Sequence, residues 1–213
     1  MFGIIVGLAA EARLARGLGC PIEIGGGGPA GAAAASRRLI AGGAAGLISF
    51  GLAGGLAPDL VAGSIVIAAR VVDGHGAVWH ADPALSARLG EPAGSLLAAT
   101  DIIATARAKQ ALWAATEALA VDIESGAVAA AAAEAGIPFA VLRAVCDPAH
   151  RDLPPAAQTA LDAAGRIQPI RLLRSIMRHP GQVGALIRLG QEAALARSAL
   201  LGRVRRIGPL GPR

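Results

Sequence analysis

The chain has 213 residues, a hydrophobic content of 54% and a formal net charge of +5, and this length suits one domain with a sizeable core. Most of the apolar excess is alanine and glycine. The longest uncharged run, residues 39–58, contains six glycines, which disfavour a membrane-spanning helix and favour a buried strand with glycine loops. The two cysteines, Cys20 and Cys146, form no CxxC pair, so the sequence supports neither a disulfide framework nor a zinc site.

Apolar segments bounded by glycine, proline and aspartate predict a chain in which strands and helices alternate. This alternation is typical of an α/β fold. Residues 51–60 and 73–92 are expected to be loops. We expect strands at residues 2–8, 21–24, 46–50, 64–72, 95–99 and 138–145, with a short strand ending at 122–124, and helices at 11–17, after 31, at 105–118, up to 136 and at 156–164.

Two acidic residues stand near the ends of predicted strands. Glu124 follows a short apolar strand and precedes an alanine-rich helix, and Asp147 follows the strand at 138–145. Open α/β folds place their ligand crevices at such strand ends. We therefore predict that Glu124 and Asp147 share one site.

Two further places offer ligand contacts. Glu11 begins a helix directly after the first strand, where a carboxylate either interacts with the helix dipole or serves catalysis. Gly26, Gly28 and Gly31 have the spacing of a dinucleotide fingerprint, but the acidic residue that this fingerprint needs about twenty positions later is missing. A glycine loop ahead of a helix still offers backbone N–H groups, so we expect Gly28 to contact a ligand.

The segment 73–92 contains His75, Trp79, His80 and Asp82. Their spacing fits neither a helical pair of ligands nor a recurring zinc pattern. We therefore predict no metal or other cofactor. Trp79 either lines a ligand pocket or covers the core.

Positive charge is concentrated near the C-terminus. Residues 1–165 carry 10 basic and 14 acidic side chains, whereas residues 166–213 carry 10 basic and one acidic side chain. We therefore divide the chain into a domain of residues 1–165 and a basic amphipathic helical extension of residues 166–213. Arginines between apolar residues at helical spacing suit contact with an anionic membrane surface, and packing helices with solvated arginines have the same pattern.

The same features predict the partners and the location of the protein. The extension has no aromatic residue to stack on bases, so no nucleic-acid partner is expected. Glu11 interrupts the apolar N-terminal run and no basic segment precedes it, so no secretory signal is predicted. We expect a cytoplasmic homo-oligomer that is peripheral on the inner membrane.

Four ordered segments within about residues 2–164 resemble the nucleoside phosphorylase and nucleosidase superfamily. They read GLAAEARLA, GGGGPAGAAAA, ISFGLAGGLAPDLVAGSIVIA and VDIESGAVAAAAAEAGIPFAVLRAVCD. The third resembles the family's GSAGGL loop, and the fourth its VEMEA helix start paired with a strand ending in SD. The resemblance implies a three-layer α/β sandwich with a central mixed β-sheet flanked by helices, plus a helical C-terminal extension. The small, alanine-rich form with a basic extension is most similar to the hopanoid-associated branch.

The resemblance implies that the chain cleaves the N-glycosidic bond of a purine nucleoside. Asp147 matches the aspartate that helps to protonate the purine at N7, and burial would favour the protonated carboxyl that this role needs. Glu124 matches the glutamate that accepts hydrogen bonds from the ribose hydroxyls. Glu11 lies one position from the glutamate that orients the attacking water in nucleosidases. Further expected substrate contacts are Asp122, Ile123, Gly28, Gly51, Ala53 and Ile103.

Several positions differ from the family's pattern. Leu52 replaces a serine of the phosphate-binding segment, and that segment has no arginine. Either backbone amides hold inorganic phosphate as a co-substrate, or water is the nucleophile. Ile123 replaces a methionine and is expected to pack under the sugar. Ile102 or Ile103 stands where an aromatic residue usually stacks on the base, which predicts a more aliphatic pocket.

The hopanoid-associated branch implies release of adenine from adenosylhopane, a lipid-linked nucleoside, during hopanoid side-chain assembly. Membrane contact through residues 166–213 would bring the site to such a substrate. One alternative is a soluble nucleosidase for methylthioadenosine or adenosylhomocysteine. Another is a non-catalytic, membrane-associated nucleoside-binding protein, against which the presence of both Asp147 and Glu124 argues.

Overall fold

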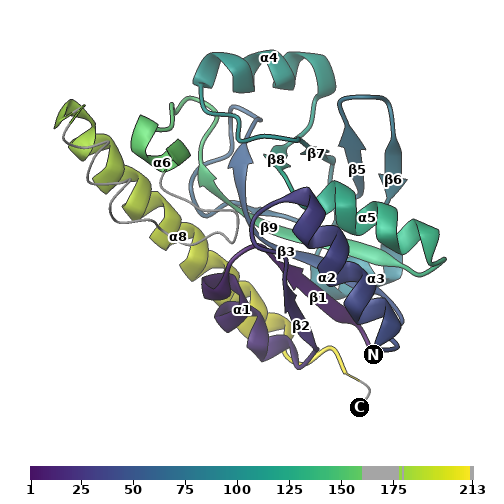
Figure 1. Ribbon diagram of the computed structural model, residues 1–213. Helices are drawn as coiled ribbons and strands as arrows, with labels where there is room; N and C mark the ends of the chain where they lie inside the picture. The colour runs from purple at the N-terminus through teal and green to yellow at the C-terminus, as the bar shows by residue number, and fades with distance from the viewer. Residues whose placement is uncertain (160–177, 179, 212–213) are drawn as a thin grey trace.

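The computed structural model describes residues 1–159, 178 and 180–211. In this part of the chain a nine-stranded sheet is covered by helices (Figure 1). The strands are β1 (Gly3–Val6), β2 (Ile22–Ile24), β3 (Leu47–Gly55), β4 (Ile65–Val66), β5 (Arg70–Asp73), β6 (Val78–His80), β7 (Ser95–Ala98), β8 (Ala120–Asp122) and β9 (Phe139–Asp147). The helices are α1 (Ala9–Ala15), η1 (Arg16–Leu18), α2 (Pro29–Ala41), α3 (Pro83–Leu89), α4 (Ala106–Thr116), α5 (Ser125–Glu134), α6 (Pro155–Thr159), η2 (Pro180–Gln182) and α8 (Val183–Ile207).

The sheet is mixed, and β3 is its central strand. The order is β2-β1-β3-β8-β7-β5-β6, with β9 also paired to β3 and β4 paired to β9. β3 pairs in parallel with β1 through its first half and with β9 along most of its length. It then pairs antiparallel with β8 at Gly54 and Gly55. The long strand β3 therefore joins β1 and β9, its parallel partners, to β8, its antiparallel partner.

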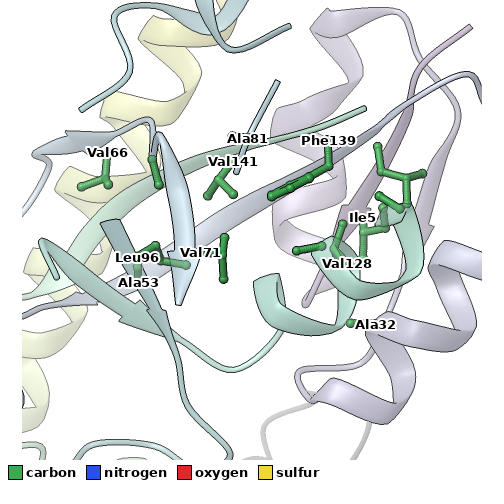
Figure 2. Close-up of a cluster of buried hydrophobic side chains, with 14 of the residues drawn as sticks. Ile5, Ala32, Ala53, Val66, Val71, Ala81, Leu96, Val128, Phe139 and Val141 are labelled. Carbon is green, nitrogen blue, oxygen red and sulfur yellow. The ribbon is translucent and has the colours of Figure 1, made fainter. Parts of the chain in front are cut away.

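Different helices cover the two faces of the sheet. α2 and α5 lie on one face (Figure 1), where small residues such as Ala32 let the helices approach closely. Figure 2 shows Val128 of α5 near Ile5 and Phe139 in this cluster. Side chains of α1, α3 and α8, among them the buried Leu200, pack on the other face. The expected three-layer fold with a central mixed sheet is confirmed.

Three segments differ from the sequence-based expectation. Residues 51–55, expected to be part of a glycine loop, continue β3, and the strand expected at 64–72 is divided into β4 and β5. Residues 73–92, expected to be irregular, contain β6 and α3. α3 carries clear start signals, because Asp82 Oδ1 accepts from the backbone N of Leu85 at 2.7 Å and Pro83 occupies the first helical position.

The long uncharged run of residues 39–58 covers the end of α2 and all of β3. It is thus divided between a helix and a buried strand, as its glycines suggested. Within the described residues, no helix combines the length and the apolar character needed to cross a bilayer.

Helix α8 runs along one side of the domain beside α1 (Figure 1). Its Ala196, Leu200 and Val204 are buried. The backbone N of Leu210 donates to the carbonyl of Leu18 at 2.8 Å, which fastens the end of the helix to the domain. The part of the extension before residue 178, and the end of the helix expected at 156–164, lie outside the described residues.

Candidate active site

Strand alternation places Arg143 at the centre of the candidate site. Phe139, Val141 and Val145 of β9 face α2 and α5, and by the two-residue period Arg143 faces the same side. Ser49 of β3 faces that side as well. Arg143 is 1% exposed, so its charge must be neutralised inside the protein.

Two carboxylates and two hydroxyls surround the Arg143 guanidinium. Its Nη2 lies 2.6 Å from Oδ2 of Asp122, and its Nη1 lies 3.1 Å from Oε2 of Glu124. Nη2 also donates to Oγ of Ser49 at 2.7 Å and to Oγ of Ser125 at 3.2 Å. Charge-assisted bonds from a planar guanidinium hold both acids in fixed positions.

Asp122 organises the turn between β8 and α5. Its Oδ1 accepts from the backbone N–H of Glu124 at 3.2 Å and of Ser125 at 3.0 Å, and its Oδ2 accepts from the Ser125 hydroxyl. With Arg143 on Oδ2 as well, both carboxylate oxygens are occupied by protein groups. Asp122 therefore supports Glu124 rather than presenting a free oxygen.

Glu124 is buried but retains one oxygen that is available for a ligand. Oε2 is paired with Arg143, and no donor among the described residues reaches Oε1. A Cβ atom at Gly7 would lie 2.1 Å from Oε1, so the absence of a side chain there makes space for the carboxylate. Burial raises the pKa of Glu124 to about 7, against the lowering effect of Arg143, while Asp122 and Glu11 raise it further.

Glu11 caps a helix and also contacts β3. Its Oε2 accepts from the backbone N of Leu8 at 2.8 Å, which caps the start of α1. Its Oε1 accepts from the backbone N of Leu52 at 2.9 Å, which brings the carboxylate beside β3. Burial raises the pKa of Glu11, opposed by Arg143 and by these backbone donors. Gly51 has φ +155°, and a Cβ atom there would lie 2.6 Å from Oε1 of Glu11.

Asp147 ends β9 and has a cation of its own. Oδ2 lies 2.6 Å from Nζ of Lys109 on α4, and Oδ1 accepts from Sγ of Cys146 at 3.2 Å. Lys109 is fully buried and Asp147 is 6% exposed. Burial raises the pKa of Asp147, while Lys109 and the hydrogen bond from Cys146 lower it.

β3 brings the two acids to the same edge of the sheet. Gly54 pairs with Asp147 on one side and with Val121 of β8 on the other. Because β8 runs antiparallel to β3, the chain from Val121 to Glu124 returns along β3, beside Arg143. A Cβ atom at Gly54 would lie 3.3 Å from the nearer Asp147 oxygen, so the Asp147 carboxylate packs against this glycine. Glycines continue β3 here because charged side chains fill the space above them.

The glycine loop before α2 also reaches this edge. The backbone N of Gly26 donates to the carbonyl of Gly7 at 3.1 Å, which places the loop next to the glycine that faces Glu124. Gly28 caps α2 and has no atom within 4 Å of a Cβ position, so space is open beside it. This loop borders the site on the side of Glu124.

The three apolar residues expected to contact substrate have different surroundings. Ala53 is buried in the core, so a ligand contact there would involve its backbone. Ile103 is half-buried and packs against the cluster that contains Leu97 and Val121. Ile123 is half-buried between the two acids Asp122 and Glu124 in the chain.

A family model described as the phosphorylase superfamily matches residues 21–174, which is more than half of the chain. The chain belongs to the phosphorylase superfamily. No curated protein sequence matches it significantly.

Solved structures of enzymes with the phosphorylase fold are similar over nearly the whole chain. Futalosine hydrolase of Helicobacter pylori is 16% identical with a TM-score of 0.67, covering 96% of this chain and 97% of that chain. The 5′-methylthioadenosine/S-adenosylhomocysteine nucleosidase of the same organism is 15% identical with a TM-score of 0.67 and the same coverage. S-adenosylhomocysteine nucleosidase of Streptococcus pyogenes is 20% identical with a TM-score of 0.63, covering 90% and 95%. At these identities the likeness establishes the fold.

Two cations central to this member of the phosphorylase superfamily were missed in the sequence. Arg143 is the charged residue in an otherwise apolar strand, and that contrast was a signal for a buried ion pair. Lys109 is the single lysine of the chain, but its surface-like helical context gave no indication of burial. Their partners lie 19 to 38 residues away and depend on how the elements pack.

A separate hollow of about 650 Å³ lies at the other end of β1, away from Gly7. Met1, Phe2, Arg88 and Leu210 contribute to its lining. None of the acids of the candidate site lines it. This hollow is thus separate from the acids at the ends of β8 and β9.

Proposed function

We propose that this protein cleaves the N-glycosidic bond of a purine nucleoside. The observation that carries the proposal is the position of two buried carboxylates, Glu124 and Asp147, after strands that both pair with Gly54. Membership of the phosphorylase superfamily supports the same reaction. Cleavage passes through a ribose with positive charge and a purine that leaves with excess electrons, so it needs groups of opposite function at the two ends of the nucleoside.

Glu124 binds the ribose in this mechanism. Its free Oε1 accepts from the 2′- and 3′-hydroxyls, and its negative charge stabilises the positive sugar. Arg143 supports the ionised form through Oε2. Because the pKa of Glu124 is about 7 in the unliganded protein, donors from the ribose would shift the equilibrium further toward the carboxylate.

Asp147 acts on the purine. In its protonated form it gives a proton to N7 as the bond between the sugar and N9 breaks, so that the bond electrons leave on a neutral purine. Burial favours the protonated form. Oδ1 is the oxygen that gives the proton, because Oδ2 is paired with Lys109.

Water is the nucleophile that the electrostatics favour. Glu11, Asp122 and Glu124 surround the buried guanidinium of Arg143, so a phosphate dianion would meet excess negative charge. Leu52 supplies no hydroxyl for phosphate. Each oxygen of Glu11 accepts one backbone hydrogen bond and can accept a second, so Glu11 orients the water.

We further propose adenosylhopane as the substrate. Ile102 is 45% exposed and Ile103 half-buried, which supplies aliphatic surface near β8 that suits a substrate with a large hydrocarbon part. On α8, Ile187 and Leu195 are exposed on the side away from the buried Leu200, and Val183 is exposed at the start of the helix. These apolar side chains would enter the interface of an anionic membrane that holds the lipid-linked nucleoside.

Adenine release tests both parts of the proposal. The full-length protein is incubated with adenosylhopane in lipid vesicles, with methylthioadenosine or with adenosylhomocysteine, each with and without inorganic phosphate. We expect adenine from adenosylhopane without phosphate, at a rate above that from the soluble nucleosides. Release from the soluble nucleosides alone would favour the soluble nucleosidase, a requirement for phosphate would contradict water as the nucleophile, and no release from any substrate would refute the enzyme.

A further inference from the structure

Lys109 is an unusual cation for this chain. The other basic residues of the chain are all arginines, and this single lysine is fully buried. It lies on α4, whose neighbouring Arg107 is exposed. Fully buried lysines are rare unless their charge is paired. The position therefore requires a compact ammonium rather than a general positive charge.

All the donors of Lys109 are occupied by protein groups. Nζ lies 2.6 Å from Oδ2 of Asp147, and it reaches the carbonyl oxygens of Arg151 at 3.1 Å, Pro148 at 3.2 Å and Asp147 at 3.3 Å. A lysine ammonium has three N–H donors and no acceptor. Because four acceptors already surround these donors, Lys109 has no donor left for a substrate.

This arrangement makes the two oxygens of Asp147 unequal. Lys109 holds Oδ2, whereas Oδ1 receives only the weak thiol donor of Cys146 at 3.2 Å. Both oxygens lie over Gly54, where a side chain would come within 3.4 Å of them. The same ammonium ties the turn of residues 148–151 to the end of β9. Oδ1 is thus the oxygen that remains for a ligand.

We propose that Lys109 is a positioning residue for Asp147, holding one carboxylate oxygen so that the other meets the purine and stabilising the carboxylate that remains after proton transfer. This inference rests on the proposed function. In this step the proton on Oδ1 passes to purine N7, the N-glycosidic bond electrons leave on the purine, and the negative charge appears on Asp147 beside Lys109. The ribose is left as an oxocarbenium ion, which water captures with loss of a proton to give the free sugar.

Among the side chains that shift the pKa of Asp147, Lys109 is the cation. The others are Cys146 on the same strand and Glu192 on α8, and Glu192 favours the protonated carboxyl. Glu192 is itself paired with Arg151 at 2.7 Å, within the turn that Lys109 binds. Removing the Lys109 charge must therefore favour the protonated form of Asp147.

The test compares full-length Lys109→Met with the wild-type protein and with Arg107→Met, a loss of positive charge on the exposed side of the same helix. The pH dependence of kcat/KM for adenine release is measured. The change in kcat/KM with pH that is still present in Glu124→Gln, called here the Asp147 limb of the profile, is assigned to the ionisation of Asp147. We expect Lys109→Met to move this limb upward by about one to three pH units and to lower kcat by about 10- to 100-fold. Arg107→Met should leave both unchanged. An unshifted limb in a folded Lys109→Met protein would show that Lys109 is structural.

A second measurement leaves Lys109 in place and does not depend on activity. In wild-type protein labelled with [13Cε]lysine and carrying a lysine-free tag, Lys109 gives the single lysine signal. We expect its chemical shift to follow the protonation of Asp147 between pH 4 and 9, with the inflection lost in Asp147→Asn. A signal without this inflection would overturn the inference. If the signal behaves as expected but no nucleoside is cleaved, the proposed reaction fails while the pairing stands.

Discussion

Nη1 of Arg143 lies 3.1 Å from Oε2 of Glu124, while the opposite oxygen of Glu124 lies over Gly7. The same guanidinium pairs with Asp122 and lies near Glu11. One positive charge thus faces three carboxylates, so a proton is readily retained within the group. Burial is the main cause that raises the pKa of Glu124 to about 7, and the negative charges of Asp122 and Glu11 add to it against the lowering effect of Arg143.

We expect nucleoside binding to depend on the ionisation of Glu124. Below pH 7 its carboxylate is protonated and accepts less strongly from the ribose hydroxyls, so the affinity for a 7-deazaadenosine analogue should weaken as the pH falls. In Glu124→Gln the affinity should be at least tenfold weaker at pH 8 and independent of pH near 7. Calorimetric titration measures both, and free adenine, which lacks a ribose, is the control ligand. Equal affinity of the two proteins for the analogue at pH 8 would contradict the ribose contact.

Asp147→Asn should abolish purine release while preserving the fold. The amide is similar in size to the carboxyl but cannot give a proton to N7, so kcat should fall by about 100-fold or more. Asp59→Asn, which changes an exposed aspartate, is the control. The rate of adenine formation at saturating nucleoside is the measurement, and undiminished turnover by Asp147→Asn would refute the assignment of the acid.

Gly7→Ala should damage the site without a backbone penalty. Gly7 does not have a positive φ, but a Cβ atom there would lie 2.1 Å from Oε1 of Glu124, which Arg143 holds in place. We expect a folded protein whose KM for nucleosides rises by about tenfold or more, because the ribose acceptor is displaced. In Gly74→Ala the new methyl group meets no atom within 4 Å, so KM should be unchanged. A wild-type KM in Gly7→Ala would show that Glu124 is free to move.

Arg143→Met should lower stability strongly. It leaves Asp122 and Glu124 buried beside Glu11 without their cation, and breaking a buried ion pair costs about 3–5 kcal/mol. For a chain of this size the Tm should fall by about 10 °C. Arg37→Met, at an exposed position of α2, should change Tm by less than about 2 °C. Thermal unfolding followed by circular dichroism measures the Tm of each variant. Similar Tm values for both would contradict a stabilising role of Arg143 and its carboxylate partners.

The exposed face of α8 predicts binding to anionic vesicles. Truncation before α8 would expose the core, because Ala196, Leu200 and Val204 are buried, so surface substitutions give the sharper experiment. We expect Gln at Arg188, Arg205 and Arg206 to reduce sedimentation with phosphatidylglycerol vesicles by about tenfold or more, since each basic residue near the surface contributes about 1 kcal/mol.

The matched control for vesicle binding replaces exposed arginines outside α8, at Arg13, Arg37 and Arg70, and so removes the same charge. It should reduce binding much less. Equal losses in the two triple variants would show that net charge, and not the α8 face, attracts the vesicles. Absence of binding by the wild-type protein would remove the membrane proposal altogether.

Local sequence patterns predicted the alternation of strands and helices and placed Glu124 and Asp147 at strand ends. These features depend on hydrophobic periodicity and on turn residues close in the chain, which is why they could be predicted. The pattern failed for Gly51, Gly54 and Gly55, which suggested a loop by their intrinsic preference. In the fold they continue β3, and groups from β8, β9, α1 and the turn after β9 occupy the space that a side chain would fill.

The sequence by itself determined the fold class and the placement of two acids, Glu124 and Asp147, near the ends of strands. Only the tertiary structure decided which cation each acid receives, Arg143 for Glu124 and Lys109 for Asp147. Such pairs join residues that are distant in the chain, and they form only when the register of β9 against β3 and the packing of α4 bring them together. Burial then makes the pairs strong, because water no longer screens the charges.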